Sequence, residues 1–331
     1  MSQTRKKDTD YVTVSTRIHA MENRLLNRER IERMISAPSE DEALKVLDEC
    51  GYDSTAGGSV ESRLAGARAA LLDEVQAAVP EPRLVDVFRL KYDYHNAKAL
   101  VKGEATGADV HRLLVSGGRY SCRQLLEGFQ KDALSGVSAR FQQAVAAARR
   151  ILAGTRDPQQ CDILLDKACY EEMARLAEDC ASPFLKGYVR LCADTANLRT
   201  AVRVVRMGKG SDFLLHVLLP GGSVAESALA AARPEDLGSL FQAGALEKAA
   251  RLGARAAQPD GGPLLAFERE CDNALTRYVA AAKRVPFGEE PVIAFLHAKD
   301  AELTAVRTIL SGRRAGLDEA MIWERLRECY V

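Results

Sequence analysis

The stretch LCADTANLRTAVRVVRMG, residues 191–208, predicts a helix that ends at a glycine. Its apolar residues Leu198, Val202 and Val205 recur every three to four positions, which is a helical and not an alternating period. The terminal glycine supplies the left-handed residue that commonly follows the last turn. The GKGS that begins there is not a phosphate-binding loop, because Arg203 stands where such a loop requires its first glycine.

Two other stretches repeat this pattern at intervals of about 100 residues. They are LKYDYHNAKALVKGE, residues 90–104, and LHAKDAELTAVRTILSG, residues 296–312. The alignment places Asn96, Asn197 and Glu302 at one position. Each copy also has a leucine six positions earlier, a glycine at its end and a proline upstream. These residues are Leu90, Leu191 and Leu296, then Gly103, Gly208 and Gly312, and finally Pro80, Pro183 and Pro286.

The repeated unit is a helical module. Each proline is expected to stop an amphipathic helix that precedes the copy. Downstream, residues 113–126 and 218–229 each predict two helices joined through a paired glycine. A module of about 100 residues is therefore used three times, with partial copies at both chain ends. We predict modules at residues 1–115, 116–220 and 221–331.

The predicted fold class is all-α. An alternating pattern occurs only in YVTVST, residues 11–16, and the helical period that follows can absorb it. Three similar helical modules in one chain favour a pseudo-threefold arrangement around a central axis.

The charge balance argues against nucleic acid as a partner. Lys and Arg total 46, as do Asp and Glu, so the formal net charge is zero. A hydrophobic content of 47% suffices for a buried core. The N-terminal MSQTRKKDTD has no apolar segment behind its charges, and no later run approaches the roughly 18 to 20 apolar residues that span a bilayer. We expect a cytosolic or peripheral protein that is a monomer in isolation.

The motifs predict no catalytic, cofactor-binding or metal-binding residue. The five histidines form no H-E-x-x-H pattern, and G-x-S-x-G is missing. The eight cysteines contain no C-x-x-C pair, so we expect buried, reduced thiols. One alternative is a zinc site, and with it an enzyme, built from Cys161, Cys169, Cys180 and Cys192.

Nearly the whole chain resembles a known family. The stretches DYHNAKALVKGE and FLLHVLLPGGS, and above all the C-terminal EEPVIAFLHAKDAELTAVRTILSGRRAGLDEAMIWERLRECYV, are similar to the C subunits of prokaryotic V-type (A/V-type) ATPases. These are the counterparts of the d subunit in the eukaryotic vacuolar enzyme. YVTVSTRIHAMENRLL and SEDEALKVLDECGYD extend the resemblance to the N-terminus.

The resemblance implies a funnel-shaped protein without an active site. Such a protein sits on the cytoplasmic face of the membrane proteolipid ring, as a peripheral subunit, and receives the central shaft, made of the D and F subunits, in its open end. It passes torque between ATP chemistry and H⁺ or Na⁺ transport. The rival interpretation is a helical scaffold with an unrelated partner, since a fold alone does not determine a function.

Basic side chains on the repeated helices are the candidate partner-binding residues. They are Lys98 and Lys102 in the first copy, Arg199, Arg203 and Arg206 in the second, and Arg307 in the third. Residues four apart lie on one face of a helix. The third copy departs from the pattern, with Thr304 and Thr308 at the equivalent positions. We expect these cations to line the funnel and meet acidic groups of the shaft, the alternative being a solvated helix face.

Overall fold

The computed structural model describes residues 5–52 and 58–331, and in these two ranges all regular structure is helical. The α-helices are α1 (Val12–Glu22), α2 (Arg28–Ser36), α3 (Glu40–Glu49), α4 (Val60–Ala78), α5 (Arg83–Thr106), α6 (Cys122–Gln130), α7 (Ala139–Thr155), α8 (Pro158–Asp179), α9 (Pro183–Arg206), α10 (Ser211–Val217), α11 (Glu226–Ala231), α12 (Leu237–Leu240), α13 (Glu247–Ala256), α14 (Leu265–Val279), α15 (Glu289–Arg314) and α16 (Glu319–Arg325). Short 3-10 helices lie at Asp8–Tyr11, His111–Leu113, Pro234–Asp236 and Ala280–Arg284. The prediction of an all-α fold is confirmed, whereas the pseudo-threefold funnel remains a prediction.

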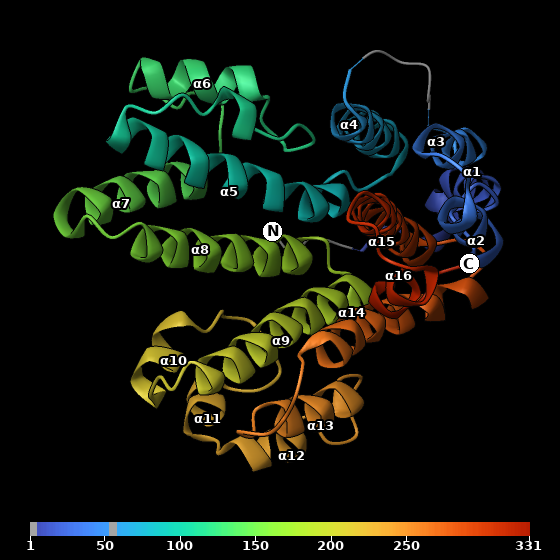
Figure 1. Ribbon diagram of the computed structural model, residues 1–331. Helices are drawn as coiled ribbons and strands as arrows, with labels where there is room; N and C mark the ends of the chain where they lie inside the picture. Colours follow the sequence, from blue (N-terminus) through green and yellow to red (C-terminus); the bar gives the residue numbers. More distant parts are fainter. Residues whose placement is uncertain (1–4, 53–57) are drawn as a thin grey trace.

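The three helices that carry the repeat, α5, α9 and α15, begin in one central hydrophobic cluster, which we call the hub (Figure 1). Helix α1 packs along α15 and adds its own apolar side chains to the hub. Buried members of the hub include Val14, Ile18, Val85, Phe88, Leu185, Val189, Val292 and Phe295. Because these side chains exclude water together, the hub holds the three helix starts in a common position.

Away from the hub, the helices pack in three groups, which we call arms (Figure 1). Arm 1 consists of α5–α8 and arm 2 of α9–α14, and each encloses its own hydrophobic cluster. Arm 3 joins α15 and α16 to α2, α3 and α4, as when Leu303 packs in one cluster with Ile31. Both ends of the chain therefore build a single arm.

The predicted module bounds 1–115, 116–220 and 221–331 remain a prediction about domains. The arms follow other limits, because arm 1 ends with α8 and arm 3 takes helices from both chain ends. Each arm nevertheless repeats one order of elements. A long helix leaves the hub, a loop and short helices follow, and a last helix returns to the hub, namely α8 in arm 1, α14 in arm 2 and α4 in arm 3.

The glycines at the ends of the long helices differ in part from the prediction. Helix α9 does end just before Gly208, which has a φ of +65°. Helices α5 and α15 continue through Gly103 and Gly312, and the left-handed residues are Gly107 and Gly316 instead. A Cβ at Gly312 would lie 2.8 Å from Cγ1 of Ile322, so that glycine permits close packing and does not stop the helix.

The prolines do separate helices. Pro80 follows the end of α4, and Pro286 lies between α14 and α15. Pro183 is the first residue of α9, where its missing N–H would have no partner within the helix. The hydroxyl of Ser182 caps the same helix by accepting from the backbone N–H of Leu185. These local signals set the three helix starts at the hub.

Candidate functional site in the central hollow

The aligned asparagines hold the loop that follows each long helix. The Nδ2 of Asn96 donates to the backbone O of Val115 at 2.9 Å, and its Oδ1 accepts from the N–H of Val115 at 2.8 Å. Asn197 makes the same two bonds with Leu219, at 2.8 and 2.7 Å. Both amides are buried, so the bonds satisfy polar groups that water cannot reach. The aligned asparagine therefore has the same structural role in arms 1 and 2.

The paired glycines are required by an acidic residue one turn earlier on the same long helix. Oδ1 of Asp194 accepts from the backbone N–H of Ser223 at 2.7 Å, and a Cβ at Gly222 would collide with that carboxylate. Asp93 makes the equivalent approach to Gly118 in arm 1. A side chain at either glycine would push the loop off its anchor.

Arm 3 replaces the loop with the N-terminal part of the chain. Glu302, at the aligned position, accepts from the backbone N–H of Leu26 at 2.6 Å and from the hydroxyl of Tyr52 at 2.6 Å. The ammonium of Lys299 lies 2.5 Å from the same carboxylate. Glu302 is buried, so these donors compensate its charge. Leu26, in the loop between α1 and α2, thus takes the place that Val115 and Leu219 hold in the other arms.

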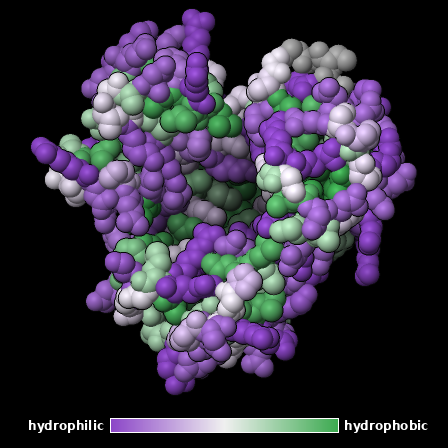
Figure 2. All heavy atoms as spheres, in the orientation of Figure 1, coloured by the Kyte–Doolittle hydropathy of each residue, from purple (hydrophilic) through white to green (hydrophobic). Residues whose placement is uncertain are grey.

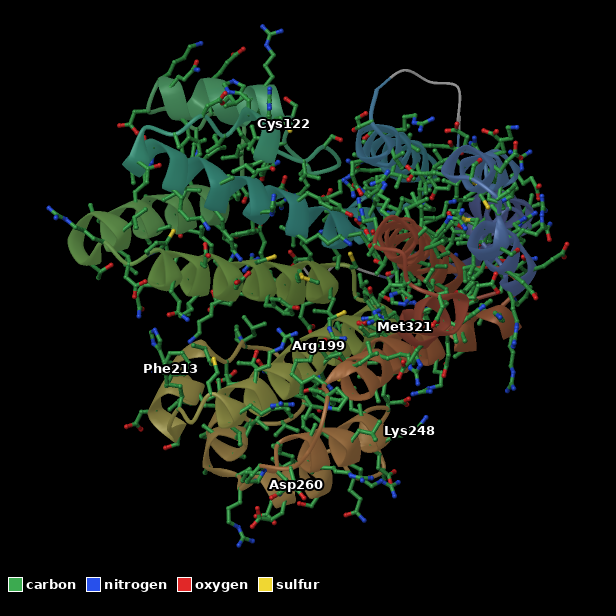
Figure 3. The ribbon with its side chains drawn as sticks, viewed as in Figure 1. Cys122, Arg199, Phe213, Lys248, Asp260 and Met321 are labelled. Carbon is green, nitrogen blue, oxygen red and sulfur yellow. The ribbon has the colours of Figure 1, made fainter. Side chains whose placement is uncertain are left out.

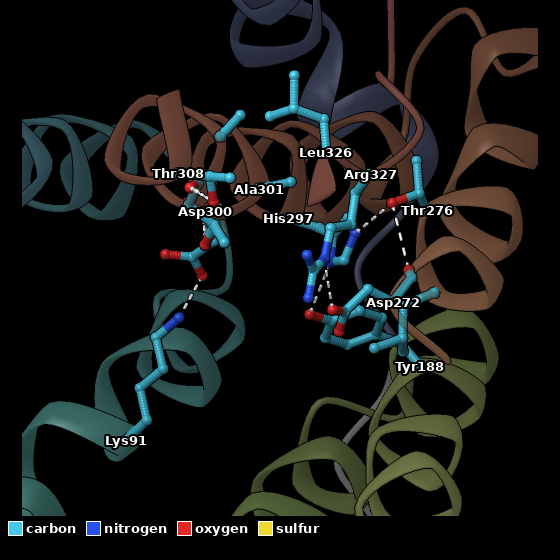
Figure 4. A pocket seen from close by; sticks show the side chains of 13 residues that line it. Lys91, Tyr188, Asp272, Thr276, His297, Asp300, Ala301, Thr308, Leu326 and Arg327 are labelled. Atoms are coloured by element: carbon cyan, nitrogen blue, oxygen red, sulfur yellow. Dashed lines mark hydrogen bonds and ion pairs between the residues drawn. The ribbon is translucent and has the colours of Figure 1, made fainter. Parts of the chain in front are cut away.

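Three lobes surround a central hollow on the face shown in Figure 2. At its floor lies a cavity of about 220 Å³ lined by residues from α5, α9, α14 and α15 and from the C-terminal segment (Figure 4). Lys91 reaches across from α5 to Asp300 on α15, and the hydroxyl of Tyr92 donates to the same carboxylate at 3.1 Å. The floor is therefore a place where helices of all three arms meet.

His297 lies at the centre of this floor. Its Nδ1 is 3.2 Å from the hydroxyl of Tyr188 and its Nε2 is 3.3 Å from the hydroxyl of Thr276 (Figure 4). Burial, aided by nearby Lys91 and opposed by Asp300, lowers the pKa of His297 to about 4. The ring is thus neutral at pH 7, with one nitrogen donating and the other accepting.

The six cations predicted to bind a partner are all engaged within their own arm. Each cation lies on a long helix and contacts a residue of the helix that returns to the hub, except for Arg206, which contacts a residue just before that helix. The ion pairs are Lys98–Asp166 at 2.5 Å, Lys102–Asp162 at 3.0 Å, Arg203–Glu268 at 2.5 Å, Arg307–Glu61 at 2.9 Å and Arg199–Asp272. Arg206 donates to the backbone O of Gly262 at 2.6 Å. We call these contacts the charge ladder.

The charge ladder pairs its cations instead of gathering them into one positive cluster. Arms 1 and 2 carry ion pairs at matching positions of the repeat. Arm 3 instead has Thr304 at the position of Lys98 and Arg199, and the hydroxyl of Thr304 donates to the backbone of its own helix at 3.0 Å. Figure 3 labels Arg199 near the middle of the molecule, where α9 runs beside α14. The pairs are partly exposed, so each contributes modestly to stability. Their partner-binding role remains a prediction.

The sequence-based search missed the floor of the hollow. Lys91, Cys192 and His297 each directly follow the repeated leucine, so the alignment already placed them at one position. Their chemical types differ, which is why no shared motif marked them. Burial raises the pKa of Cys192 to about 12, and its hydrogen bond with Tyr188 opposes that rise. This thiol is an unreactive neighbour of His297.

A comparison with protein families matches the chain over residues 14–325 to the family described as "ATP synthase (C/AC39) subunit". The match includes all three copies of the repeat and the hollow between them.

The chain belongs to this ATP synthase C/AC39 subunit family. The C subunit of a V-type sodium ATPase from Enterococcus hirae is 23% identical over 97% of this chain and 99% of its own length. The C subunit of a V-type ATP synthase from Thermus thermophilus is 27% identical over 96% and 98%. The C subunit of an A-type ATP synthase from Haloferax volcanii is 25% identical over 96% and 97%. Membership makes the chain a noncatalytic subunit of a V-type or A-type ATPase complex.

In the described ranges of this C/AC39 family member, the four cysteines of the zinc alternative do not come together as a group that could hold a metal ion. Nowhere in residues 5–52 and 58–331 do three His, Cys, Asp or Glu residues come together in a way that could hold a metal ion. The four cysteines proposed for it are unpaired thiols, and burial raises the pKa of Cys169 and Cys180 to about 12. Among the helices of the same two ranges, none combines the length and the apolarity needed to cross a membrane.

Proposed function

We propose that the chain is the central-stalk rotor subunit that joins the shaft, made of the D and F subunits, to the proteolipid ring at the cytoplasmic face of the membrane. The observation that carries the proposal is the hollow, bordered by three arms that start from one apolar hub. A shaft end seated in the hollow would contact helices of all three arms. Family membership supports a place in such a complex, and relatives are named as C subunits of V-type ATPases and ATP synthases.

Transmission of torque requires arms that resist bending and shear. Each long helix is joined to the returning helix of its arm by the charge ladder and by a buried hydrophobic cluster. The bonds of Asn96 and Asn197 hold the intervening loops, and Glu302 performs that task in arm 3. A sideways load on one arm would therefore reach the hub through several parallel contacts, which is the property that a coupling protein needs.

Binding of the shaft heterodimer tests the proposal. Thr304 lines the floor cavity and hydrogen-bonds only to its own helix, so Thr304→Trp fills the hollow without removing a contact between helices. We expect this variant to bind a purified D–F heterodimer at least tenfold more weakly than the unchanged chain, by calorimetry. Thr106→Trp is the matched control, because Thr106 is also exposed and, in the described part of the chain, its hydroxyl bonds only backbone O atoms of its own helix, at the end of α5.

Two results would contradict the assignment. Binding of the heterodimer to neither the unchanged chain nor the control would remove the shaft as partner and favour the scaffold alternative. Equal affinity of all three proteins would keep the shaft but place its seat outside the floor of the hollow.

A further inference from the structure

A second cavity, of about 530 Å³, lies between α1, α4 and α15, on the side of arm 3. Its charged lining residues are Arg17, Arg24, Arg68, Glu74 and Lys299. Four of these five are cations, in a chain whose formal net charge is zero. None of them lines the floor cavity of the central hollow. This region is therefore a separate basic cavity.

Arg68 is the unusual member of this lining. It is only 7% exposed, yet its guanidinium makes a single hydrogen bond to the described residues, from Nη2 to the backbone O of Ser116 at 2.8 Å, and its Nε is buried without an acceptor. The face of the guanidinium lies over the ring of Tyr92, 4.1 Å from the centroid. Arg89, which is 3% exposed, bonds Asp73 and two backbone carbonyls. Buried charges are normally compensated, as that of Arg89 is by the carboxylate of Asp73, whereas no carboxylate of the described residues pairs with Arg68.

The other charges of the cavity do not supply that counter-anion. Glu74 is paired with Arg17 at 2.6 Å, and Lys299 with Glu302. Across the described ranges, the side chain of Arg24 is exposed and forms neither a hydrogen bond nor an ion pair. Two guanidinium groups thus line one cavity without a carboxylate partner. Guanidinium donors match the oxygen geometry of phosphate groups, and the volume suits a small ligand.

We propose that this cavity binds a small phosphate-bearing anion, with Arg68 and Arg24 as the principal groups. A phosphate oxygen would accept the free N–H donors of Arg68, and the second guanidinium would approach from the rim. The cation–π contact with Tyr92 holds Arg68 in place while the site is open. The inference does not depend on the proposed role in the stalk.

Calorimetric titration of the full chain with pyrophosphate tests the proposal, at an ionic strength held constant with chloride. We expect saturable binding to one site. Arg68→Met keeps the volume of the side chain and removes its charge, so it should weaken binding at least tenfold. Arg24→Gln should weaken pyrophosphate binding severalfold. Because the side chain of Arg24 is exposed and forms no hydrogen bond or ion pair in the described ranges, this variant keeps the test valid if Arg68→Met does not fold. Arg112→Gln is the control, because Arg112 is exposed and lies outside the cavity.

Parallel titrations with inorganic phosphate and ATP identify the source of the phosphate. If ATP binds with no higher affinity than pyrophosphate, the site recognises the phosphates alone. If ATP binds with higher affinity, the site also contacts the nucleoside. Both results agree with the proposal. Equal affinity of the unchanged chain, Arg68→Met and Arg24→Gln would overturn it. So would the absence of any heat of binding with all three anions, or binding of an acidic peptide in their place.

Discussion

At the residue scale, each of Asn96, Asn197 and Glu302 fits the groups that its arm presents. An amide both donates and accepts, so an asparagine can hold the N–H and the carbonyl of one loop residue together. In arm 3 the facing groups are an N–H, a hydroxyl and an ammonium, all of which donate, and a carboxylate accepts from all three. The alignment located these residues, but the groups they contact lie elsewhere in the sequence and could not be predicted.

Asn197→Asp tests the amide anchor. The carboxylate can accept from the N–H of Leu219 but cannot donate to its carbonyl, and it is buried without a counter-ion. We expect the free energy of unfolding in urea to fall by about 2 kcal/mol. Asn23→Asp is the control, since Asn23 is exposed and the one hydrogen bond of its side chain to the described residues is long, at 3.5 Å. Equal unfolding midpoints for the two variants would show that the anchor contributes no stability.

His297 predicts a loss of stability in acid. Its pKa is about 4 in the folded chain and near 6.5 when unfolded, so between these values the unfolded chain binds more protons. The neutral ring therefore stabilises the fold fully above pH 6.5, and this contribution, on the order of 3 kcal/mol, is lost as the pH falls toward 4. Urea unfolding of the unchanged chain and of His297→Gln at pH 7 and 4.5 checks it. A pH dependence that is the same in both proteins would exclude His297 as the cause.

At the element scale, the ion pairs of the charge ladder in arms 1 and 2 join residues that are 60 to 73 positions apart in sequence. The helical period predicted that Lys98 and Lys102 share one face of their helix, and that Arg199 and Arg203 do the same. In the structure the two residues of each set pair with the same neighbouring helix. The acidic partners were not predictable, because nothing local indicates which helix returns alongside. Replacement of all four cations by glutamate is expected to weaken shaft binding. It should also destabilise the free protein, because each glutamate would face an acidic residue.

A double-mutant cycle on Arg203 and Glu268 measures one rung. Arg203→Glu alone should destabilise the chain, and Glu268→Arg in the same protein should restore most of the loss, because the exchanged charges still attract. The coupling energy should be about 0.5 kcal/mol, since Arg203 is 56% exposed. Thermal or urea unfolding of the four proteins gives this value. A coupling energy of zero would mean that solvent screens the ion pair between Arg203 and Glu268 completely.

Two glycines within helices show where local sequence signals fail. Gly66 in α4 has no atom within 4 Å of a built Cβ, whereas a Cβ at Gly103 in α5 would collide with Val110. Gly66→Ala should raise the free energy of unfolding by about 0.5 to 1 kcal/mol, because alanine favours the helix. Gly103→Ala should lower it by about 1 kcal/mol or more, in the range of an overpacked core. Equal effects in urea unfolding would refute the packing role of Gly103.

At the scale of the whole molecule, the repeat and the partial copies at both chain ends were visible in the sequence, and the all-α class followed from them. The sequence did not show that the two partial copies complete each other. Leu26 and Glu302 are 276 residues apart, and no period or motif relates them. The floor of the hollow was missed for a similar reason, since Lys91, Tyr188 and His297 come together only after the three arms have converged on the hub.

The composition of arm 3 also sets an order of events during synthesis. Arms 1 and 2 are continuous segments and can fold as they leave the ribosome, whereas α2, α3 and α4 must wait for α15, the last long helix to be made. At the usual rates of translation that wait lasts on the order of ten seconds or more. During it, the apolar cluster that contains Ile31 and Leu47 is without the side chains that α15 contributes to it. An unfinished chain therefore lacks one of the three arms that border the hollow.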